Sequence, residues 1–368
     1  MTGLMTNAES TEPWTAAEGP LAQMFEIQAA WCAGAGSPFS GDLLRCAKRD
    51  LETGGRMATL LLPWRGASRR DIVDDAVPLR WLAAAHDLAL SGQAPDLAAA
   101  YPTRDHPQGD ARAAWTALSA ATDDRPDTFV AFMAHEPQTN EVGRSACLLG
   151  GFLTIARETN LPLRIFELGA SAGLNQLWDR YHYDLGSAGA WGAANAPVRL
   201  SSEWRGPAPP YMGDVTVASR AACDRKPIDL GDPLARRRLK AYVWAGQFER
   251  IDRLEAAITM ALEAGTRVDA EDAVHWASRA VPASGATTVL FHSVFWQYLP
   301  PESRAALAAR VETLGGEATA QAPFAWLRME PPGDLAPMEL GLTLWPGGER
   351  RVLARVHPHG AYIEWAPA

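Results

Sequence analysis

The spacing of apolar residues along the chain changes near residue 137. Before that point, apolar side chains recur every three or four positions, which predicts amphipathic helices because such positions share one helical face. After it, short apolar runs alternate with helical patterns, an order typical of parallel strands joined by helices. The pattern therefore predicts a helical domain over residues 1–137 and an α/β domain over residues 138–368.

The helical domain is predicted from four amphipathic stretches, separated by breaks rich in proline and glycine. They are residues 21–31, 43–51, 79–90 and 111–120. In the α/β domain, seven short apolar runs predict strands and four longer patterns predict helices. The strands are 164–168, 215–223, 266–268, 287–292, 323–329, 339–344 and 351–356, and the helices are 174–181, 233–263, 270–281 and 302–314. Turn residues 346–348 predict an antiparallel hairpin at the end of a mostly parallel sheet, and residues 182–205 are expected to be an inserted hairpin.

Residues 163–175 predict a ligand site. A short apolar strand runs there into a turn that contains Gly169 and Gly173, and then into a helix. Glycines permit a sharp turn and a close approach of a ligand, and the N–H groups of a helix N-terminus attract polar or anionic atoms. Glu167 lies at the carboxyl end of the strand, where open parallel sheets bind ligands. We therefore expect a pocket beside Glu167.

Residues 167–173, Glu-Leu-Gly-Ala-Ser-Ala-Gly, resemble the first motif of class I S-adenosylmethionine-dependent methyltransferases, an acidic residue followed by spaced glycines. Ser171 stands where that family often has a glycine. The resemblance implies a Rossmann-like, seven-stranded, mostly parallel sheet, S-adenosylmethionine as the cofactor, and methyl transfer to a small molecule. It implies that the cofactor contacts Glu167, Gly169, Ser171, Gly173 and Asn175.

The same resemblance assigns cofactor contacts to two further acidic residues. Asp224, at the end of the second predicted strand, corresponds to the carboxylate that holds the ribose hydroxyls. Its alternative role is that of a turn residue, and Asp184 is then the alternative ribose partner. Asp269, after the third predicted strand, corresponds to the residue that accepts a hydrogen bond from the adenine amino group. Its alternative role is the N-cap of the following helix.

Residues 138–145 open the apolar helix that leads into the first strand, and they are expected to face the same pocket. A helix that packs antiparallel to a strand begins near the carboxyl end of that strand. Asn140 either caps the helix or contacts the cofactor. Glu141 and Arg144 are three positions apart on one helical face, so they either pair with each other or reach the ligand. The guanidinium of Arg144 suits the methionyl carboxylate of the cofactor.

The loop after the fourth predicted strand contains the candidate catalytic residues His292, Ser293 and Tyr298. The methyltransferase family usually positions substrate and catalytic groups in this loop. A histidine beside a serine can act as a general base near neutral pH. The alternative is a buried histidine at a strand end that is satisfied by the backbone.

The whole chain also resembles a bacterial family of unknown function, numbered 2332. The similarity extends over both predicted domains and implies one architecture for the full length, without naming a substrate. It rests on residues 138–145, 166–183, 224–229, 242–244 and 291–300.

Other functions fit some of the same residues. Residues 169–173 also spell Gly-x-Ser-x-Gly, the nucleophile elbow of α/β-hydrolases, with Ser171 as the nucleophile. That fold has several strands before the elbow, whereas helical patterns precede it here. A second alternative is a protein of the methyltransferase fold that binds adenosylmethionine, or a related nucleotide, without transferring a methyl group. The Gly-x-x-x-Gly spacing disfavours a dinucleotide dehydrogenase.

Composition narrows the expected partners. A net charge of −9 argues against a long nucleic acid, because phosphate binding relies on clusters of lysine and arginine. The four cysteines lie far apart without a Cys-x-x-Cys pair, so we expect no metal site. No apolar run reaches the ~20 residues of a membrane span. We expect a cytoplasmic protein that acts on a small molecule, in an oligomeric state that the sequence does not specify.

Overall fold

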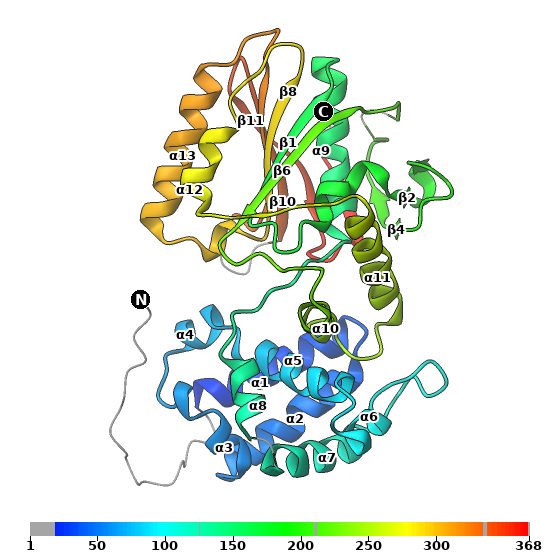
Figure 1. Ribbon diagram of the computed structural model, residues 1–368, viewed down its shortest axis with the longest axis vertical. Coiled ribbons are helices and arrows are strands. Elements are labelled where there is room, and N and C mark those ends of the chain that lie inside the picture. Colours follow the sequence, from blue (N-terminus) through cyan, green and yellow to red (C-terminus); the bar gives the residue numbers. More distant parts are fainter. Residues whose placement is uncertain (1–18, 125, 210–211, 334–336, 367–368) are drawn as a thin grey trace. The chain divides into compact units, whose positions relative to one another are not determined.

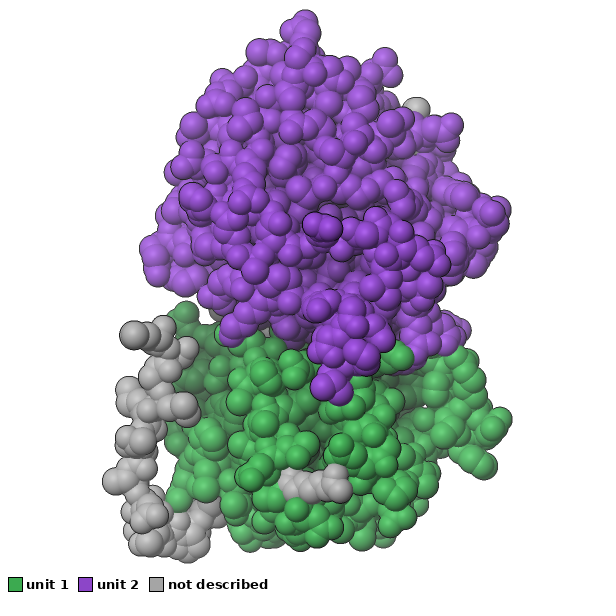
Figure 2. Space-filling view, in the orientation of Figure 1, with its two compact units in different colours: residues 1–137, 237–248 green, residues 138–236, 249–368 purple. Residues whose placement is uncertain are grey.

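The computed structural model of the protein describes residues 19–124, 126–209, 212–333 and 337–366. The chain forms two compact units (Figure 2). Unit 1 comprises residues 1–137 and 237–248, and unit 2 comprises residues 138–236 and 249–368. The sequence pattern assigned all residues after 137 to the second domain, but the segment 237–248 belongs to the helical unit.

Unit 1 is helical. Its helices are α1 (Pro20–Gly34), α2 (Pro38–Glu52), α3 (Arg56–Leu60), α4 (Arg69–Asp74), α5 (Val77–Leu90), α6 (Pro95–Ala100), α7 (Ala111–Asp124) and α8 (Pro126–Met133), with the 3-10 turn η1 (Leu62–Trp64). The four predicted stretches fall in α1, α2, α5 and α7. The remaining helices were not predicted because they have eight residues or fewer, too short for a helical period to be recognised.

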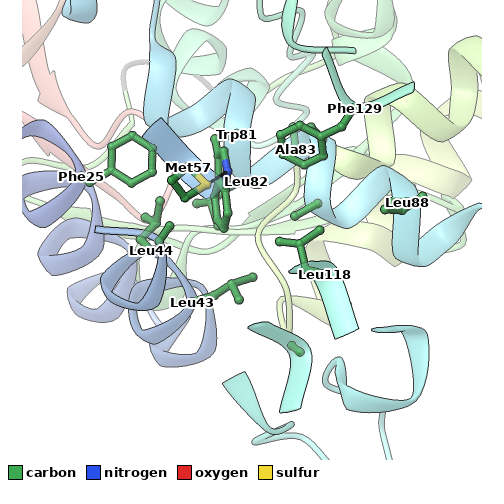
Figure 3. Close-up of a cluster of buried hydrophobic side chains, with 14 of the residues drawn as sticks. Phe25, Leu43, Leu44, Met57, Trp81, Leu82, Ala83, Leu88, Leu118 and Phe129 are labelled. Carbon is green, nitrogen blue, oxygen red and sulfur yellow. Dashed lines mark hydrogen bonds between the residues drawn. The ribbon is translucent and has the colours of Figure 1, made fainter. Parts of the chain in front are cut away.

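The core of unit 1 is built around Trp81 of α5, which is fully buried (Figure 3). Its ring lies edge-on to Phe25 of α1 at 5.9 Å and to Phe129 of α8 at 6.3 Å between ring centroids. The indole N–H donates to Sδ of Met57 at 3.0 Å. Leucines from α2, α5 and α7 fill the space around these rings. Large aromatic side chains from several helices therefore hold the short helices together.

Unit 2 contains a nine-stranded sheet in the order β5-β12-β11-β10-β9-β8-β1-β6-β7. Its strands are β1 (Leu163–Leu168), β5 (Glu203–Arg205), β6 (Val217–Asp224), β7 (Asp269–Ala270), β8 (Thr287–Ser293), β9 (Phe324–Glu330), β10 (Met338–Trp345), β11 (Glu349–Val356) and β12 (Tyr362–Trp365). Strands β7, β6, β1, β8 and β9 are parallel, whereas β10, β11 and β12 follow as an antiparallel meander. The α/β class is confirmed, but the count of seven strands is wrong because β5 and β12 were missed.

Helices lie on both faces of the sheet (Figure 1). Helix α9 (Arg144–Thr159) lies on one face, and α12 (Ala273–Trp276) and α13 (Pro301–Gly316) lie on the other. The chain also forms α10 (Pro233–Ala241), whose residues from 237 onward belong to unit 1, α11 (Phe248–Glu263), and the 3-10 segments η2 (Leu174–Arg180), η3 (Gly186–Ala188), η4 (Ala277–Arg279) and η5 (Trp296–Tyr298). Helix α9 approaches the sheet closely, since a Cβ at Gly151 would lie 2.4 Å from Cδ1 of Leu327. On the other face, α12 and α13 cover a cluster that includes Phe166 and Trp326.

Three predicted helices differ from the structure. The pattern over 270–281 is the short helix α12 followed by the 3-10 segment η4, and Ala270 lies in β7. The pattern over 233–263 is two helices, α10 and α11, interrupted at Gly246, which has a φ of +84°. Residues 174–180 form the 3-10 segment η2 instead of an α-helix. The predicted insertion at 182–205 contains the antiparallel pair β2 (His182–Asp184) and β3 (Ala190–Trp191), and β4 (Arg199–Ser201) pairs parallel with β2. The segment then continues into β5, which joins the main sheet beside β12.

Candidate functional site

The strand order of unit 2 reverses between β1 and β8. From β1 the chain proceeds to β6 and β7 on one side, and then returns to β8 and β9 on the other. Both neighbours of β1 are parallel to it, with Leu168 opposite Cys223 and Glu167 opposite Phe291. The carboxyl ends of β1, β6 and β8 therefore share one edge of the sheet. In open α/β sheets, ligands bind at this edge where the strand order reverses.

The loop after β1 contains the two glycines of the sequence motif, and both have a positive φ, +64° at Gly169 and +74° at Gly173. A Cβ at Gly169 would lie 2.3 Å from Cδ2 of Phe295, in the loop after β8. A Cβ at Gly173 would lie 2.5 Å from Nε2 of Gln176 and 2.8 Å from Cγ2 of Val268. Glycine is therefore required at both positions for two reasons. The backbone conformation disfavours other residues, and neighbouring side chains occupy the space that a Cβ would need.

Two residues without the freedom of glycine adopt a left-handed backbone at this edge. Ser171 has a φ of +54°, and Val294 in the loop after β8 has a φ of +52°. Such a conformation costs of the order of 1–3 kcal/mol and is concentrated at functional sites. The loop around Ser171 is held by hydrogen bonds, because its N–H donates to Oδ2 of Asp224 at 2.9 Å and its carbonyl accepts from the N–H of Ile228 at 3.1 Å.

Glu167 is buried at the end of β1, with 3% of its surface exposed. Its Oε2 atom has no hydrogen-bond partner among the described residues, and neither does Oγ of the buried Ser171. Burial raises the pKa of the Glu167 carboxyl well above its ordinary value, and Asp224 raises it further, against an opposing effect of Arg144. A protonated carboxyl can both donate and accept a hydrogen bond. The edge thus carries two buried polar groups with unused hydrogen-bonding capacity.

Asp224 and Asp269, two further acidic residues of the predicted cofactor site, already bind parts of the protein. Asp224, the last residue of β6, accepts from the N–H of Ser171 and, through Oδ1, from the N–H of Lys226 at 2.9 Å. Asp269 lies inside β7, where its Oδ2 accepts from Nε1 of Trp276 at 2.8 Å and pairs with Arg279 at 2.7 Å. Asp224 therefore fixes the glycine loop, and Asp269 fixes the following turn.

The structure also shows where the residues of the alternative assignments lie. The N-cap of α12 is Asp272, whose side chain accepts from the N–H groups of Val274 and His275, so Asp269 is not the cap. Asp184, the alternative ribose partner, is exposed in β2 and accepts from the N–H of Gly186 at 3.0 Å.

The segment before α9 meets the loop after β1, through asparagine side chains. Oδ1 of Asn140 accepts from the N–H of Leu174 at 3.0 Å, so Asn140 satisfies the start of η2 and does not cap its own helix. Oδ1 of Asn175 accepts from the hydroxyl of Ser145 at 2.7 Å. The structure thus brings Asn140 and Asn175 to the same edge as Glu167 and Ser171.

Glu141 and Arg144 do not pair with each other. Glu141 is buried, and it forms an ion pair with Arg250 of α11 and accepts from the N–H of Gly143 at 3.0 Å. Burial alone would raise the pKa of Glu141, but Arg250 and His359 outweigh that effect and lower it. The local spacing suggested Arg144 as the partner, whereas Arg250 comes from a distant helix that no sequence signal identified.

Arg144 binds two backbone carbonyls. Its Nε donates to the carbonyl of Pro358 at 3.3 Å and its Nη1 to that of Ser293 at 3.4 Å. The side chain therefore joins the end of β8 to the turn between β11 and β12. Beside it, burial lowers the pKa of His359 to about 3. Sequence reasoning missed His359, because nothing in a His-Pro-His-Gly stretch indicates its long-range neighbours.

The candidate catalytic histidine is fully buried and both of its ring nitrogens are occupied. Nδ1 of His292 lies 2.6 Å from Oε1 of Glu330, and Nε2 lies 3.2 Å from Nε1 of Trp326. An indole N–H can only donate, so Nε2 accepts and Nδ1 carries the proton that is donated to Glu330. The ring also stacks on Trp296 at 5.7 Å between centroids. This is the buried strand-end histidine of the alternative interpretation, satisfied by side chains instead of backbone.

The other two candidate catalytic residues differ in exposure. Ser293 is buried and its carbonyl accepts from Arg144. Tyr298, in η5, is 61% exposed. Within the described ranges, no three side chains among histidine, cysteine, aspartate and glutamate are arranged to hold a metal ion. None of the helices found in those ranges is both long and apolar enough to cross a membrane.

Fold and site together define an α/β protein with a buried polar site where the order of its parallel strands reverses. The chain belongs to the family described as an uncharacterized protein conserved in bacteria (DUF2332), whose model matches residues 22–365. Neither the curated proteins nor the solved structures that were compared include a match to this chain.

Proposed function

We propose that the protein transfers a methyl group from S-adenosylmethionine to a small molecule. The proposal is supported by the order of the parallel strands. Numbered along the chain, β1, β6, β7, β8 and β9 lie in the order 3-2-1-4-5, the arrangement of doubly wound nucleotide-binding sheets. It is also supported by the acidic residue and spaced glycines after β1, which resemble the first motif of class I methyltransferases.

The single observation that carries the proposal is Glu167, a buried carboxyl with an unpartnered oxygen at the edge where the strand order reverses. An unpaired buried polar group costs about 1–3 kcal/mol, so a ligand that supplies its hydrogen bond gains that amount. Ser171 adds a second unpartnered oxygen four positions along the chain. A polar, nucleoside-containing cofactor fits these groups, and Glu167 and Ser171 are the residues proposed to bind it.

The activated methyl group of the cofactor supplies the chemistry, so the protein has mainly to align the acceptor with it. Asp224 has the role of holding the loop around Ser171 in its left-handed conformation. The loop after β8 packs against Gly169 through the ring of Phe295. His292 is assigned no proton transfer, because its two ring nitrogens are occupied.

Calorimetric titration with S-adenosylmethionine and S-adenosylhomocysteine tests the proposal. We expect saturable binding of both by the full chain. Glu167→Ala should weaken it by roughly tenfold to a hundredfold, the value of one or two buried hydrogen bonds. Glu167→Gln should weaken it less, because an amide resembles a protonated carboxyl. Glu349→Gln, at an exposed position of β11, is the control. Absence of binding by folded protein would reject the proposal, and binding without methyl transfer to any acceptor would favour the non-catalytic alternative.

One observation favours a second function, that of a serine hydrolase. Ser171 combines a φ of +54° with a position between a strand and a helical turn, as a nucleophile elbow does. No histidine among the described residues accepts its hydroxyl proton, however, and Oγ has no hydrogen-bond partner there. Asp334 and His357, which follow Ser171 in the chain, are the candidates for the other two residues of a triad. Asp334 lies outside the described residues, and Nδ1 of His357 accepts from the N–H of His359. Labelling of Ser171 by a fluorophosphonate would support the hydrolase and argue against methyl transfer.

A further inference from the structure

Unit 1 contains a second group of buried polar atoms that the proposed function does not use. Tyr242 is 4% exposed and Arg80 is 6% exposed. Neither Oη of Tyr242 nor Nε of Arg80 has a hydrogen-bond partner among the described residues. Both groups can donate, and an unpaired buried donor costs about 1–3 kcal/mol. The described residues of unit 1 therefore supply no acceptor for these two donors.

Arg80, in α5, uses its remaining donors only in part. Nη1 donates to the carbonyl of Met133 and Nη2 to Oδ1 of Asp75, each at 3.3 Å. Charge-assisted hydrogen bonds of a guanidinium are usually shorter, about 2.7–2.9 Å. The other oxygen of Asp75 accepts from the indole N–H of Trp64 at 2.7 Å, so this carboxylate is shared. The Arg80 guanidinium is thus fixed in place but not saturated.

Tyr242 and Arg238 both lie against the ring of Phe132. Phe132 is the residue next to Met133, whose carbonyl accepts from Arg80. The rings of Tyr242 and Phe132 have centroids 5.9 Å apart, and Cζ of Arg238 lies 5.8 Å from the centroid of Phe132. Arg238 is half-buried, and no hydrogen bond or ion pair joins it to another described residue. Burial raises the pKa of the Tyr242 phenol, and Arg80 and Arg238 both oppose that rise, as cations near the phenol oxygen must.

We propose that Arg80, Arg238 and Tyr242 bind a phosphate group. Two guanidiniums and one carboxylate, Asp75, leave the cluster with one unbalanced positive charge. A phosphate has three or four acceptor oxygens, which matches the unpartnered Nε and Oη atoms together with the free donors of Arg238. The half-buried position of Arg238 gives the anion a route from solvent. The ligand is inorganic phosphate or the phosphate group of a small metabolite.

The test is the binding of inorganic phosphate to the full-length protein, by calorimetry and by the shift of the thermal midpoint at constant ionic strength set with sodium chloride. We expect saturable binding, with a midpoint that rises with phosphate concentration by mass action. Tyr242→Phe and Arg238→Gln should each weaken binding about tenfold or more. Arg80 is left unchanged because it also anchors Met133 and Asp75.

Arg112→Gln is the matched control, since Arg112 is exposed on α7 and the substitution removes the same charge. It should leave phosphate binding unchanged. No saturable binding by the unmodified protein, or an equal loss in Arg112→Gln, would overturn the proposal, and so would full affinity in Tyr242→Phe. A parallel titration with phenyl phosphate separates the two sources, because tighter binding of the ester identifies an organic phosphate as the ligand. This test does not depend on methyl transfer.

Discussion

Burial of Glu167 couples the stability of the protein to pH. Its pKa in the folded protein lies well above the ordinary value of 4.5, through burial first and then through Asp224. The folded state therefore keeps the proton over the pH range between the two values, and stability falls as pH rises through that range. Each unit by which the pKa is raised costs about 1.4 kcal/mol once the pH exceeds the folded pKa.

Glu167→Gln removes this titration. We expect the thermal midpoint of the variant, relative to the unmodified protein, to increase between about pH 4 and about pH 8, because unfolding releases a proton from the glutamate in this range and the glutamine has none to release. Parallel thermal melts at both pH values measure the difference. Glu349→Gln should show the same offset at each pH. An equally constant offset in Glu167→Gln would mean that folding does not shift the pKa of Glu167.

At the residue level, the sequence predicted where a residue lies in its strand or helix better than which residues it contacts. Glu167 was expected at the carboxyl end of a strand, and it lies there, because strand boundaries follow from local apolar runs. Glu141 and Arg144, three positions apart, were expected either to pair with each other or to reach the ligand, but Glu141 pairs with Arg250. Local spacing can only propose neighbours along the same helix, whereas tertiary packing brings α11 to Glu141 and directs Arg144 to the backbone of Pro358 and Ser293.

At the level of elements, Glu330 connects β9 to the loop after β8. Its Oε1 accepts from Nδ1 of His292 at 2.6 Å and from the N–H of Phe295 at 3.0 Å. Glu330→Ala leaves two donors without an acceptor, so we expect a loss of about 2–4 kcal/mol in the free energy of unfolding. Glu330→Gln should lose much less, since the amide oxygen can accept from both. Urea denaturation of the two variants checks the difference, and equal losses would show that the charge, and not the hydrogen bonds, stabilises this junction.

Elements with a long, regular pattern were predicted, and short or interrupted ones were not. The apolar strand β8 is buried at every position, and its seven residues were recognised within one residue. The four-residue strand β12 was missed, because its pairing with β5 joins segments that are far apart in sequence. The interruption between α10 and α11 was missed because apolar residues continue through 242–244, where they pack as a loop in unit 1.

At the scale of the whole molecule, we expect the folding of unit 1 to require the segment 237–248. Tyr242 and Trp244 belong to the core of unit 1. Within that unit, Arg237 pairs with Asp87 at 2.8 Å, and the hydroxyl of Ser37 donates to the carbonyl of Ala245 at 2.7 Å. The first unit is therefore discontinuous in sequence, which a reading from one end of the chain to the other does not detect.

A fragment of residues 1–137 should consequently be less stable than the same fragment fused to residues 237–248 through a flexible glycine-serine linker. Loss of a buried tryptophan alone costs about 3–5 kcal/mol, and the fragment also loses Tyr242 and the pairing of Asp87. We expect the fusion to unfold cooperatively in urea, and the short fragment to unfold at lower denaturant or without a cooperative transition. Trp244→Ala in the fusion should return its midpoint toward that of the fragment, because Trp244 is 8% exposed and lies 6.3 Å from Trp31 between ring centroids. An identical midpoint for the fragment and the fusion would show that residues 1–137 fold without the segment, and that the segment only binds to a core which is already complete.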